Sequence, residues 1–288
     1  MAEFTLVRRR HRLHNGTLAI GDVMAKPLIA DGWLEPVNPV IVGGVPVAPL
    51  TTQQWVELML SDVRKARENG ASPTYNTSAN GNVISQWASD PELRAVMSQA
   101  DSIAADGVSV MWGAKLFAGE IIPDRAATTD LFHDLAEAAQ QHGYSIYLLG
   151  ATAEQNAKAL ERIRKLYPGL NIAGGRDGYF CLEEEAGVCE EIVKAGTDIL
   201  FVGLGVGRQD FFVDRNISRL QGVGWVKTCG GLFDFLAGLR SRAPEWMQRN
   251  GLEWLYRTML EPRRLLLRYA TTNTRAIWMM ITASGKAS

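Results

Sequence analysis

The chain of 288 residues has little of what would assign it to a simple functional class. It has only three cysteines, Cys181, Cys189 and Cys229, an odd number without metal-ligand spacing, so we expect reduced thiols and no disulfide framework. None of its four histidines lies within ligand spacing of a cysteine, which argues against a zinc site. It also has no aspartate-any-aspartate triplet of the kind that holds a divalent ion on a nucleotide diphosphate. We therefore expect metal-independent chemistry and no resident cofactor.

No charge of one sign dominates, because 30 lysines and arginines face 31 aspartates and glutamates, a formal net charge of −1. A general nucleic-acid binder is therefore not expected. The chain has no apolar run of 18 residues and no secretory signal, so we expect a cytoplasmic protein, soluble or attached to a membrane surface. The basic run at 8–12 is typical of a solvated segment, and contact with anionic lipid is the alternative.

Strand-like and helix-like segments alternate along the middle of the chain. Strands are predicted at 74–78, 102–105, 145–150, 171–174, 198–203 and 225–228, with helices between them, and the runs at 145–150 and 198–203 indicate buried strands. This order predicts an α/β fold with a Rossmann-like, mainly parallel sheet, flanking helices and right-handed crossovers. Composition divides the chain into an N-terminal arm (1–50), a Rossmann-like core (51–240) and a helical C-terminal appendage (241–288).

Asp106 stands at the exit of the predicted strand at 102–105, just before a helix that ends near Gly119. Open α/β sheets bind their ligands at such carboxyl ends of strands. We predict that Asp106 is a general base. The alternative, which local sequence favours equally, is that Asp106 only caps the helix that begins at Gly107.

A glycine run at 203–207, with Gly203, Gly205 and Gly207, follows one predicted strand and precedes a helix. Glycines in this position let backbone amides approach a phosphate at the helix N-terminus. The spacing is not GxGxxG, and no acid ends the next strand, so a nucleotide diphosphate fits better than a dinucleotide. A tight turn alone is the alternative. Gln209 in the first helical turn is a candidate for hydrogen bonding to a sugar hydroxyl, or an exposed first-turn residue.

Ser78, Asn80 and Arg125 also lie near the ends of predicted strands. The planar guanidinium of Arg125 matches the oxygens of a leaving diphosphate, and Ser78 and Asn80 are candidates for positioning the sugar or the diphosphate. Taken singly, each is better explained as a turn residue or a surface arginine. Their common placement at strand ends favours a ligand site.

The segment 240–275 differs in composition from the rest of the chain. It carries eight arginines and three acids, a local charge of +5, interleaved with tryptophan, leucine, methionine and tyrosine. Arginine and tryptophan on an amphipathic helix suit a membrane interface. A terminal helix packed on the core, with its arginines in solvent, is the alternative.

Several long motifs resemble the WecG/TagA/CpsF family of glycosyltransferases. The most specific are GGLFDFLAG at 230–238, RAPEWMQ at 242–248, GLEWLYR at 251–257 and EPRR at 261–264. Shorter matches are ADG at 105–107, YPGL at 167–170, DGYF at 177–180 and DILFVGLG at 198–205. The resemblance extends from about residue 78 to residue 269 and leaves the N-terminal arm outside it.

The resemblance implies transfer of a sugar from a UDP-sugar to a polyprenyl-diphosphate-linked saccharide, with inversion at the anomeric carbon. It implies that Asp106 is the base and that Gln209 belongs to the glycine loop of Gly203 and Gly205. Ser78 and Asn80 match a threonine-any-asparagine pair, and Arg125 matches an arginine that follows the aspartate-glycine motif.

The resemblance further implies an appendage that docks on the cytoplasmic face of the inner membrane as a peripheral element and helps to complete the active site. We expect Arg257, Arg263 and Arg264 to bind the membrane surface or the diphosphate. Assembly of an exopolysaccharide or a related envelope polymer follows by family alone.

The sequence departs from the family pattern at Ser78, which replaces threonine, at Gly207 and Asp210, which replace proline and glutamate, and after Arg125, where a glycine is missing. The donor stays open among N-acetylmannosamine, its uronic acid, glucuronic acid and glucose. The acceptor saccharide and a homo-oligomeric state also stay open. A nucleotide-dependent oxidoreductase or epimerase, suggested by the glycine run, and a non-enzymatic membrane scaffold, suggested by the C-terminal segment, are the alternatives.

Overall fold

The computed structural model describes residues 26–286, and its main feature is a sheet of six parallel strands. Their order is β4-β3-β8-β7-β5-β6. The strands are β3 (Thr74–Ala79), β4 (Ser102–Ala105), β5 (Ser145–Gly150), β6 (Asn171–Arg176), β7 (Ile199–Gly203) and β8 (Trp225–Thr228). The predicted α/β, Rossmann-like sheet is confirmed. Because all six strands run the same way, their carboxyl ends share one edge of the sheet.

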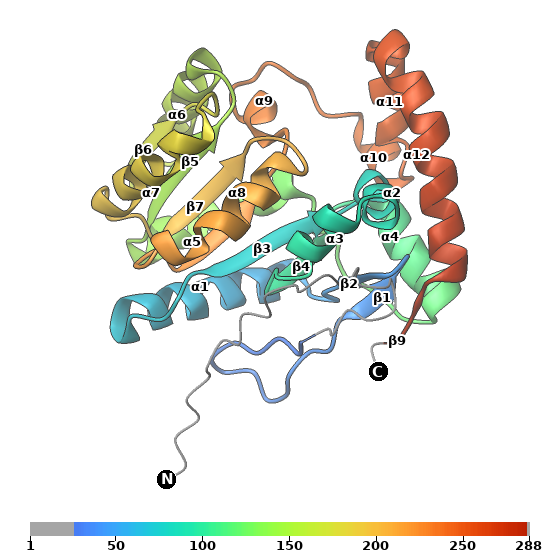
Figure 1. Cartoon of the computed structure of the whole chain (residues 1–288), viewed down its shortest axis with the longest axis horizontal. Helices are drawn as coiled ribbons and strands as arrows, with labels where there is room; N and C mark the ends of the chain where they lie inside the picture. The colour runs from blue at the N-terminus through green and yellow to red at the C-terminus, as the bar shows by residue number, and fades with distance from the viewer. Residues whose placement is uncertain (1–25, 287–288) are drawn as a thin grey trace.

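Helices connect and cover the strands (Figure 1). They are α1 (Thr52–Asn69), α2 (Gly81–Ser89), α3 (Pro91–Met97), α4 (Val108–Gly113), α5 (Thr128–His142), α6 (Ala153–Leu166), α7 (Glu185–Lys194), α8 (Arg208–Asn216), α9 (Leu232–Leu236), α10 (Glu245–Arg249), α11 (Glu253–Leu260) and α12 (Pro262–Thr282). A π-helical turn, η1 (Ala114–Ala118), continues α4, and η2 (Leu182–Glu184) and η3 (Ile217–Arg219) are 3₁₀ turns.

Local sequence signals set most of the helix boundaries. Thr152 and Gln155 form a capping box at the start of α6. α1 and α5 end at Gly70 and Gly143, whose φ values of +61° and +65° lie in the left-handed region that glycine adopts without steric cost. A glycine stands at the point where each helix stops, so local chemistry is enough to place these ends.

Helix α2 is a correction to the turn that Ser78 and Asn80 suggest in the sequence. Asn80 is its N-cap, with Oδ1 accepting a hydrogen bond from Val83 N at 3.2 Å. Val83, Ile84 and Trp87 are buried at helical spacing. Asparagine and glycine are typical both of turns and of helix starts, so their presence concealed the beginning of α2.

Two apolar layers enclose the main sheet. Helices α1, α5 and α6 pack on one face, where Phe201 and Trp225 of the sheet are buried. Helices α7 and α8 cover the other face, around Leu200 and Val226. These two layers cover the faces of the sheet and leave its carboxyl edge, where the strands end, uncovered.

The two ends of the described chain meet beside β4. β1 (Val40–Val42) and β2 (Val45–Val47) form a hairpin, and β9 (Gly285–Lys286) pairs antiparallel with β1. Ala48 N donates to Ile103 O at 2.8 Å, so the chain after the hairpin covers the free edge of β4.

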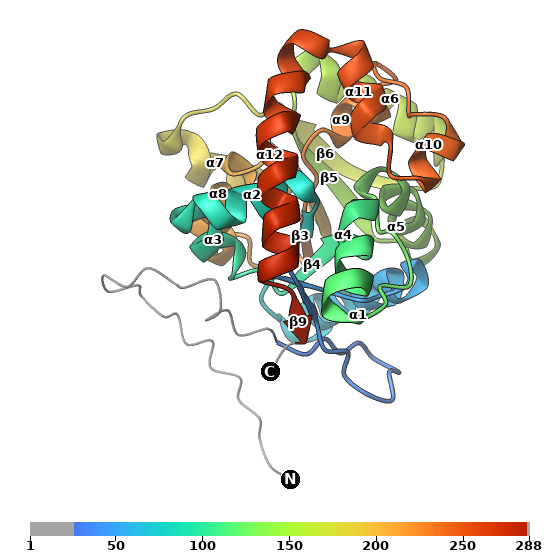
Figure 2. The ribbon, with the colours of Figure 1, turned by 90° about the vertical axis from the view of Figure 1, so that its right-hand side faces the viewer.

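Helix α12 packs along α2, and its C-terminal half is buried through Ala276, Met279 and Met280 (Figure 2). The C-terminal half of α12 is therefore fixed to the core.

Among residues 26–286, no helix is long and apolar enough to cross a bilayer. The basic run at 8–12 lies outside the described residues, so the predictions for it stay predictions.

Candidate active site

The carboxyl edge of the sheet brings Asn80 and Asp106 together. β3 and β4 pair in parallel with Ala79 opposite Ala105, so the residues that follow the two strands are neighbours. Asn80 Nδ2 lies 3.4 Å from Asp106 Oδ2. This distance is long for a hydrogen bond, so Oδ2 is only weakly bound by Asn80.

Asp106 does not cap the helix that follows it. The N-cap of α4 is Gly107, without a side-chain hydrogen bond. Asp106 Oδ1 instead accepts from the backbone N–H of Thr128, the first residue of α5, at 2.8 Å. The alternative that Asp106 caps the helix beginning at Gly107 is therefore wrong, and the carboxylate is oriented by an N–H that α5 leaves unpaired.

Ser78 contacts a buried lysine that the sequence analysis missed. Lys227 in β8 is only 1% exposed, and its Nζ donates to Thr77 O at 2.8 Å and to Ser78 Oγ at 2.7 Å. Burial lowers the pKa of Lys227 to about 8, and the nearby charge of Asp106 acts in the opposite direction. A lysine inside an otherwise apolar strand is the signal that identifies it in the sequence.

Arg125 belongs to a pair of arginines near the N-terminus of α5, and both bind Glu253 of α11. Arg125 Nη1 donates to Glu253 Oε2 at 2.6 Å, and Arg242 Nη2 lies 3.5 Å from Glu253 Oε1. Arg242 also donates to Thr129 Oγ1 and to Asp130. Thr129 follows the residue that binds Asp106, so the pair lies close to the candidate base.

The charge environment of Arg242 supports this placement. Desolvation opposes its charge, but Asp130, Glu253 and Asp106 outweigh desolvation and raise the pKa of Arg242. In the sequence, Arg242 is part of the RAPEWMQ motif, and no role at the site was predicted for it. Its role at this edge depends on the connection after α9, which no local pattern reveals.

A cavity of about 160 Å³ lies between α9 and α11, beside the arginine pair. Arg240, Arg242, Glu253 and Tyr256 are among the residues that line it. Cationic and aromatic groups in one cavity suit a phosphorylated or glycosylated ligand.

The glycine run joins β7 to α8 at the same edge. Gly203 has no room for a side chain, because an added Cβ would lie 2.3 Å from the Phe233 ring. Gly205 and Gly207 both have φ of +88°, and nothing lies within 4 Å of a Cβ added to either. The backbone at these two positions therefore has free space beside it, enough for a ligand to approach. A glycine run that served only as a tight turn would not need this space.

Gln209 is buried, so the alternative of an exposed first-turn residue is wrong. Its Oε1 accepts from Gly230 N at 3.0 Å and ties the glycine loop to the β8–α9 turn. Its neighbour Asp210 accepts from Tyr75 OH at 2.6 Å and from Gly207 N at 3.0 Å. Burial raises the pKa of Asp210. These contacts of Gln209 and Asp210 stabilise the glycine loop.

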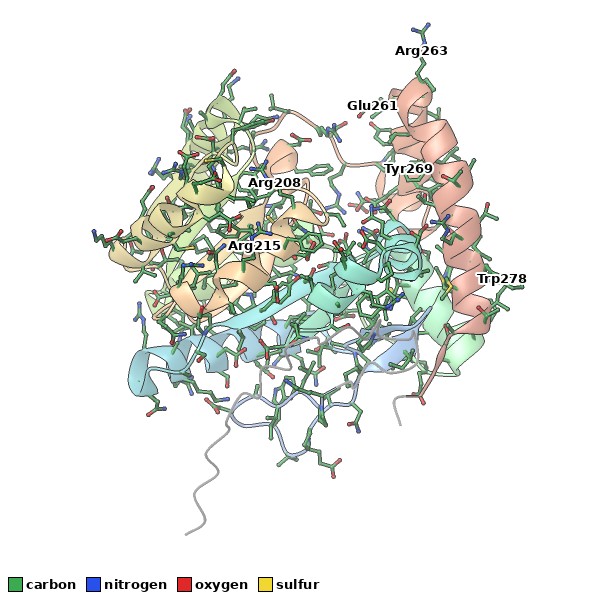
Figure 3. All side chains as sticks on the ribbon, viewed as in Figure 1. Arg208, Arg215, Glu261, Arg263, Tyr269 and Trp278 are labelled. Carbon is green, nitrogen blue, oxygen red and sulfur yellow. The ribbon has the colours of Figure 1, made fainter. Side chains whose placement is uncertain are left out.

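The predicted arginines of the appendage are placed differently from Arg125. Arg263 is exposed at the N-terminal end of α12 and points away from the rest of the molecule (Figure 3). Arg257 and Arg264 lie in α11 and α12, but their side chains are outside the described part of the structure. Within residues 26–286, no three histidine, cysteine, aspartate or glutamate side chains are grouped as metal ligands.

Comparison with known proteins finds a family model and curated relatives that resemble this chain. Residues 40–287 match the model described as the Glycosyl transferase WecG/TagA/CpsF family, so the match includes the β1–β2 hairpin that the motifs did not reach. A curated relative is the N-acetylglucosaminyldiphosphoundecaprenol N-acetyl-beta-D-mannosaminyltransferase of Bacillus spizizenii. It is 34% identical over 190 residues, which cover 66% of this chain and 72% of the relative.

Proposed function

The chain belongs to the WecG/TagA/CpsF family of glycosyltransferases, and from that premise we propose that it transfers N-acetylmannosamine from UDP-N-acetylmannosamine to N-acetylglucosaminyl-diphospho-undecaprenol. The relative's name supports this sugar and this acceptor. The open glycine loop at the start of α8 supports a nucleotide diphosphate as the carrier of the sugar. The family assignment leaves the oxidoreductase, epimerase and scaffold alternatives without support.

The observation that carries the proposal is the asymmetric binding of Asp106. Oδ1 is fixed by Thr128 N, whereas the contact that the described residues give Oδ2 is the long one from Asn80. Oδ2 accepts the proton of the acceptor hydroxyl as the hydroxyl oxygen forms its bond to the anomeric carbon. The bond from that carbon to the UDP oxygen breaks, and UDP leaves with the electron pair. Attack from the face opposite UDP inverts the anomeric carbon.

Arg125 and Arg242 stabilise the negative charge that grows on the departing diphosphate. Both bind an oxyanion, the Glu253 carboxylate. Fixed guanidinium groups supply positive charge without reorganisation during the reaction. We therefore propose a reaction that needs no metal ion.

The protein docks peripherally on the cytoplasmic face of the inner membrane, where the lipid-linked acceptor is presented. The four exposed tryptophans of the described residues are Trp112, Trp246, Trp254 and Trp278. They belong to α4, α10, α11 and α12, which lie on the side of the molecule that faces the viewer in Figure 2. Trp278 points away from the rest of the molecule (Figure 3). Tryptophan is favoured at membrane interfaces, so this side supports a lipid-facing surface.

Replacing two of these tryptophans tests the lipid-facing surface. We expect Trp112→Ser with Trp278→Ser to weaken binding to vesicles that contain anionic phospholipid by about tenfold or more, because two apolar insertions are lost. Co-sedimentation measures the binding. The control is Leu166→Ser, which replaces an exposed leucine of α6. Helix α6 lies on the side of the molecule away from α12 (Figure 1). Equal loss in the control, or no loss in the double variant, would overturn the proposed surface.

A direct assay tests the proposed reaction. The purified chain is mixed with UDP-N-acetylmannosamine and a synthetic prenyl-diphosphate N-acetylglucosamine in detergent, with EDTA present. We expect a disaccharide product with the anomeric configuration opposite to that of the donor, read by NMR. UDP-N-acetylglucosamine, UDP-glucose and NAD are controls. Transfer from another UDP-sugar would overturn the donor, and protein that is stabilised against heat only by NAD would overturn the reaction class.

A further inference from the structure

Lys227 is a buried cation that the chemistry described so far does not use. Its side chain extends from β8 toward the carboxyl end of β3 and contacts the backbone carbonyl of Thr77 and the hydroxyl of Ser78. Its hydrogen-bond acceptors are thus a carbonyl and a hydroxyl rather than a carboxylate. A buried charge is costly unless an opposite charge or hydrogen bonds compensate it. Because Lys227 lies at the carboxyl edge of the sheet, we expect an anionic ligand to supply part of that compensation.

The contact with Lys227 fixes the role of the Ser78 hydroxyl. An ammonium group has three donors and no acceptor, so Ser78 Oγ must accept from Nζ. The hydrogen of Ser78 then points elsewhere, and its nearest described partner is Thr128 Oγ1 at 3.3 Å. That distance is beyond the usual range for O–H···O bonds, so the hydrogen of Ser78 is weakly held. Ser78 is also only partly buried, so a ligand can reach it.

We propose that Lys227 is a positioning residue of the donor site: its ammonium group holds the Ser78 hydroxyl as a hydrogen-bond donor directed at the diphosphate of the nucleotide sugar. This role rests on the proposed function, because it requires an anionic donor at this edge. Loss of the Lys227 proton creates a neutral amine with a lone pair, which accepts from Ser78. The hydroxyl hydrogen then turns away from the ligand.

The groups around Lys227 determine the direction of the pH effect. Burial lowers the pKa of Lys227 to about 8, while the nearby Asp106 and Asp210 carboxylates act in the opposite direction. Burial also holds the pKa of Cys229 well above its usual range, so this thiol stays neutral near pH 8. The ammonium form is therefore present below about pH 8 and is lost as the pH rises through that value. Donor binding that depends on it must weaken in the same interval.

The test is the pH dependence of UDP affinity, measured by titration calorimetry from pH 6.5 to 9.5, and of kcat/KM for the donor. In the wild type we expect both to fall at the alkaline end, with a midpoint near pH 8. In Lys227→Met we expect the affinity at pH 7 to be lower by about tenfold, the value of one charge-assisted hydrogen bond, and flat up to pH 9.5. Lys158→Met, which removes an exposed α6 lysine, is the control and keeps the wild-type profile.

Two further variants keep the test decisive if Lys227→Met does not fold. Lys227→Arg carries a permanent charge and should extend UDP binding beyond pH 9. Ser78→Ala should abolish the alkaline limb while Lys227 is still present, because Lys227 acts through Ser78. An alkaline limb that survives in either variant would overturn the proposal. A wild type that binds no UDP at any pH would instead overturn the proposed function, so the two failures are distinguishable.

Discussion

Asp106→Asn should reduce glycosyl transfer by about 10²- to 10⁴-fold, the usual contribution of a general base, while leaving the protein folded and able to bind UDP. The amide keeps an oxygen that can accept from Thr128 N, so the hydrogen bond that orients the side chain survives. The contact of Asn80 with the other oxygen is already long at 3.4 Å, so little stability depends on it. The substitution therefore removes the proton acceptor and its negative charge, which acts on Lys227 and Arg242, and keeps the hydrogen bond from Thr128 N.

The measurement is kcat for transfer under donor and acceptor saturation, with UDP affinity and thermal unfolding measured on the same preparation. Asp90→Asn is a matched control, because Asp90 also accepts from a backbone N–H at a helix start, that of Leu93, at 3.0 Å. Both variants should unfold near the wild-type temperature, and only the first should lose activity. Near wild-type transfer by Asp106→Asn would reduce Asp106 to a residue that only binds the start of α5.

The sheet could be predicted because strand-like segments alternate with helix-like segments along the chain. The predicted strands at 198–203 and 225–228 agree with β7 and β8 to within one residue. Strand order could not be predicted, because the pairing of β3 with β8 joins residues about 150 positions apart. That pairing brings Lys227 into contact with Ser78. The contact cannot be inferred from the sequence, so no role could be predicted for the lysine.

Asp106 shows the same division between local and distant information. Its place at a strand exit could be predicted from the residues around it. The identity of its hydrogen-bond partner could not, since Thr128 N comes from a helix that begins 22 residues later. Arg125 was predicted as a diphosphate ligand, but its contact with Glu253 depends on how α11 returns to the core.

Arg242→Gln should lower kcat/KM for the UDP-sugar by about 10²- to 10³-fold, the usual cost of removing one donor that stabilises developing negative charge. The guanidinium joins α5, through Thr129 and Asp130, to Gln248 and Glu253 of the appendage. Glutamine keeps a polar side chain but loses the charge and the bidentate geometry. The loss should appear in kcat as well as KM, because charge on the diphosphate increases as the bond to UDP breaks.

A matched control and a double-mutant cycle separate this electrostatic role from docking of the appendage. Arg249→Gln removes an exposed arginine that pairs only locally with Glu245, so transfer should stay at the wild-type level. Glu253→Gln frees both Arg125 and Arg242 from a competing carboxylate, so it should strengthen UDP binding. If Arg242 acts on the diphosphate, that gain should be smaller in the Arg242→Gln background, because only Arg125 is then left to be released from Glu253. If Arg242 only anchors α11, the two substitutions should weaken UDP binding alike and neither should lower kcat.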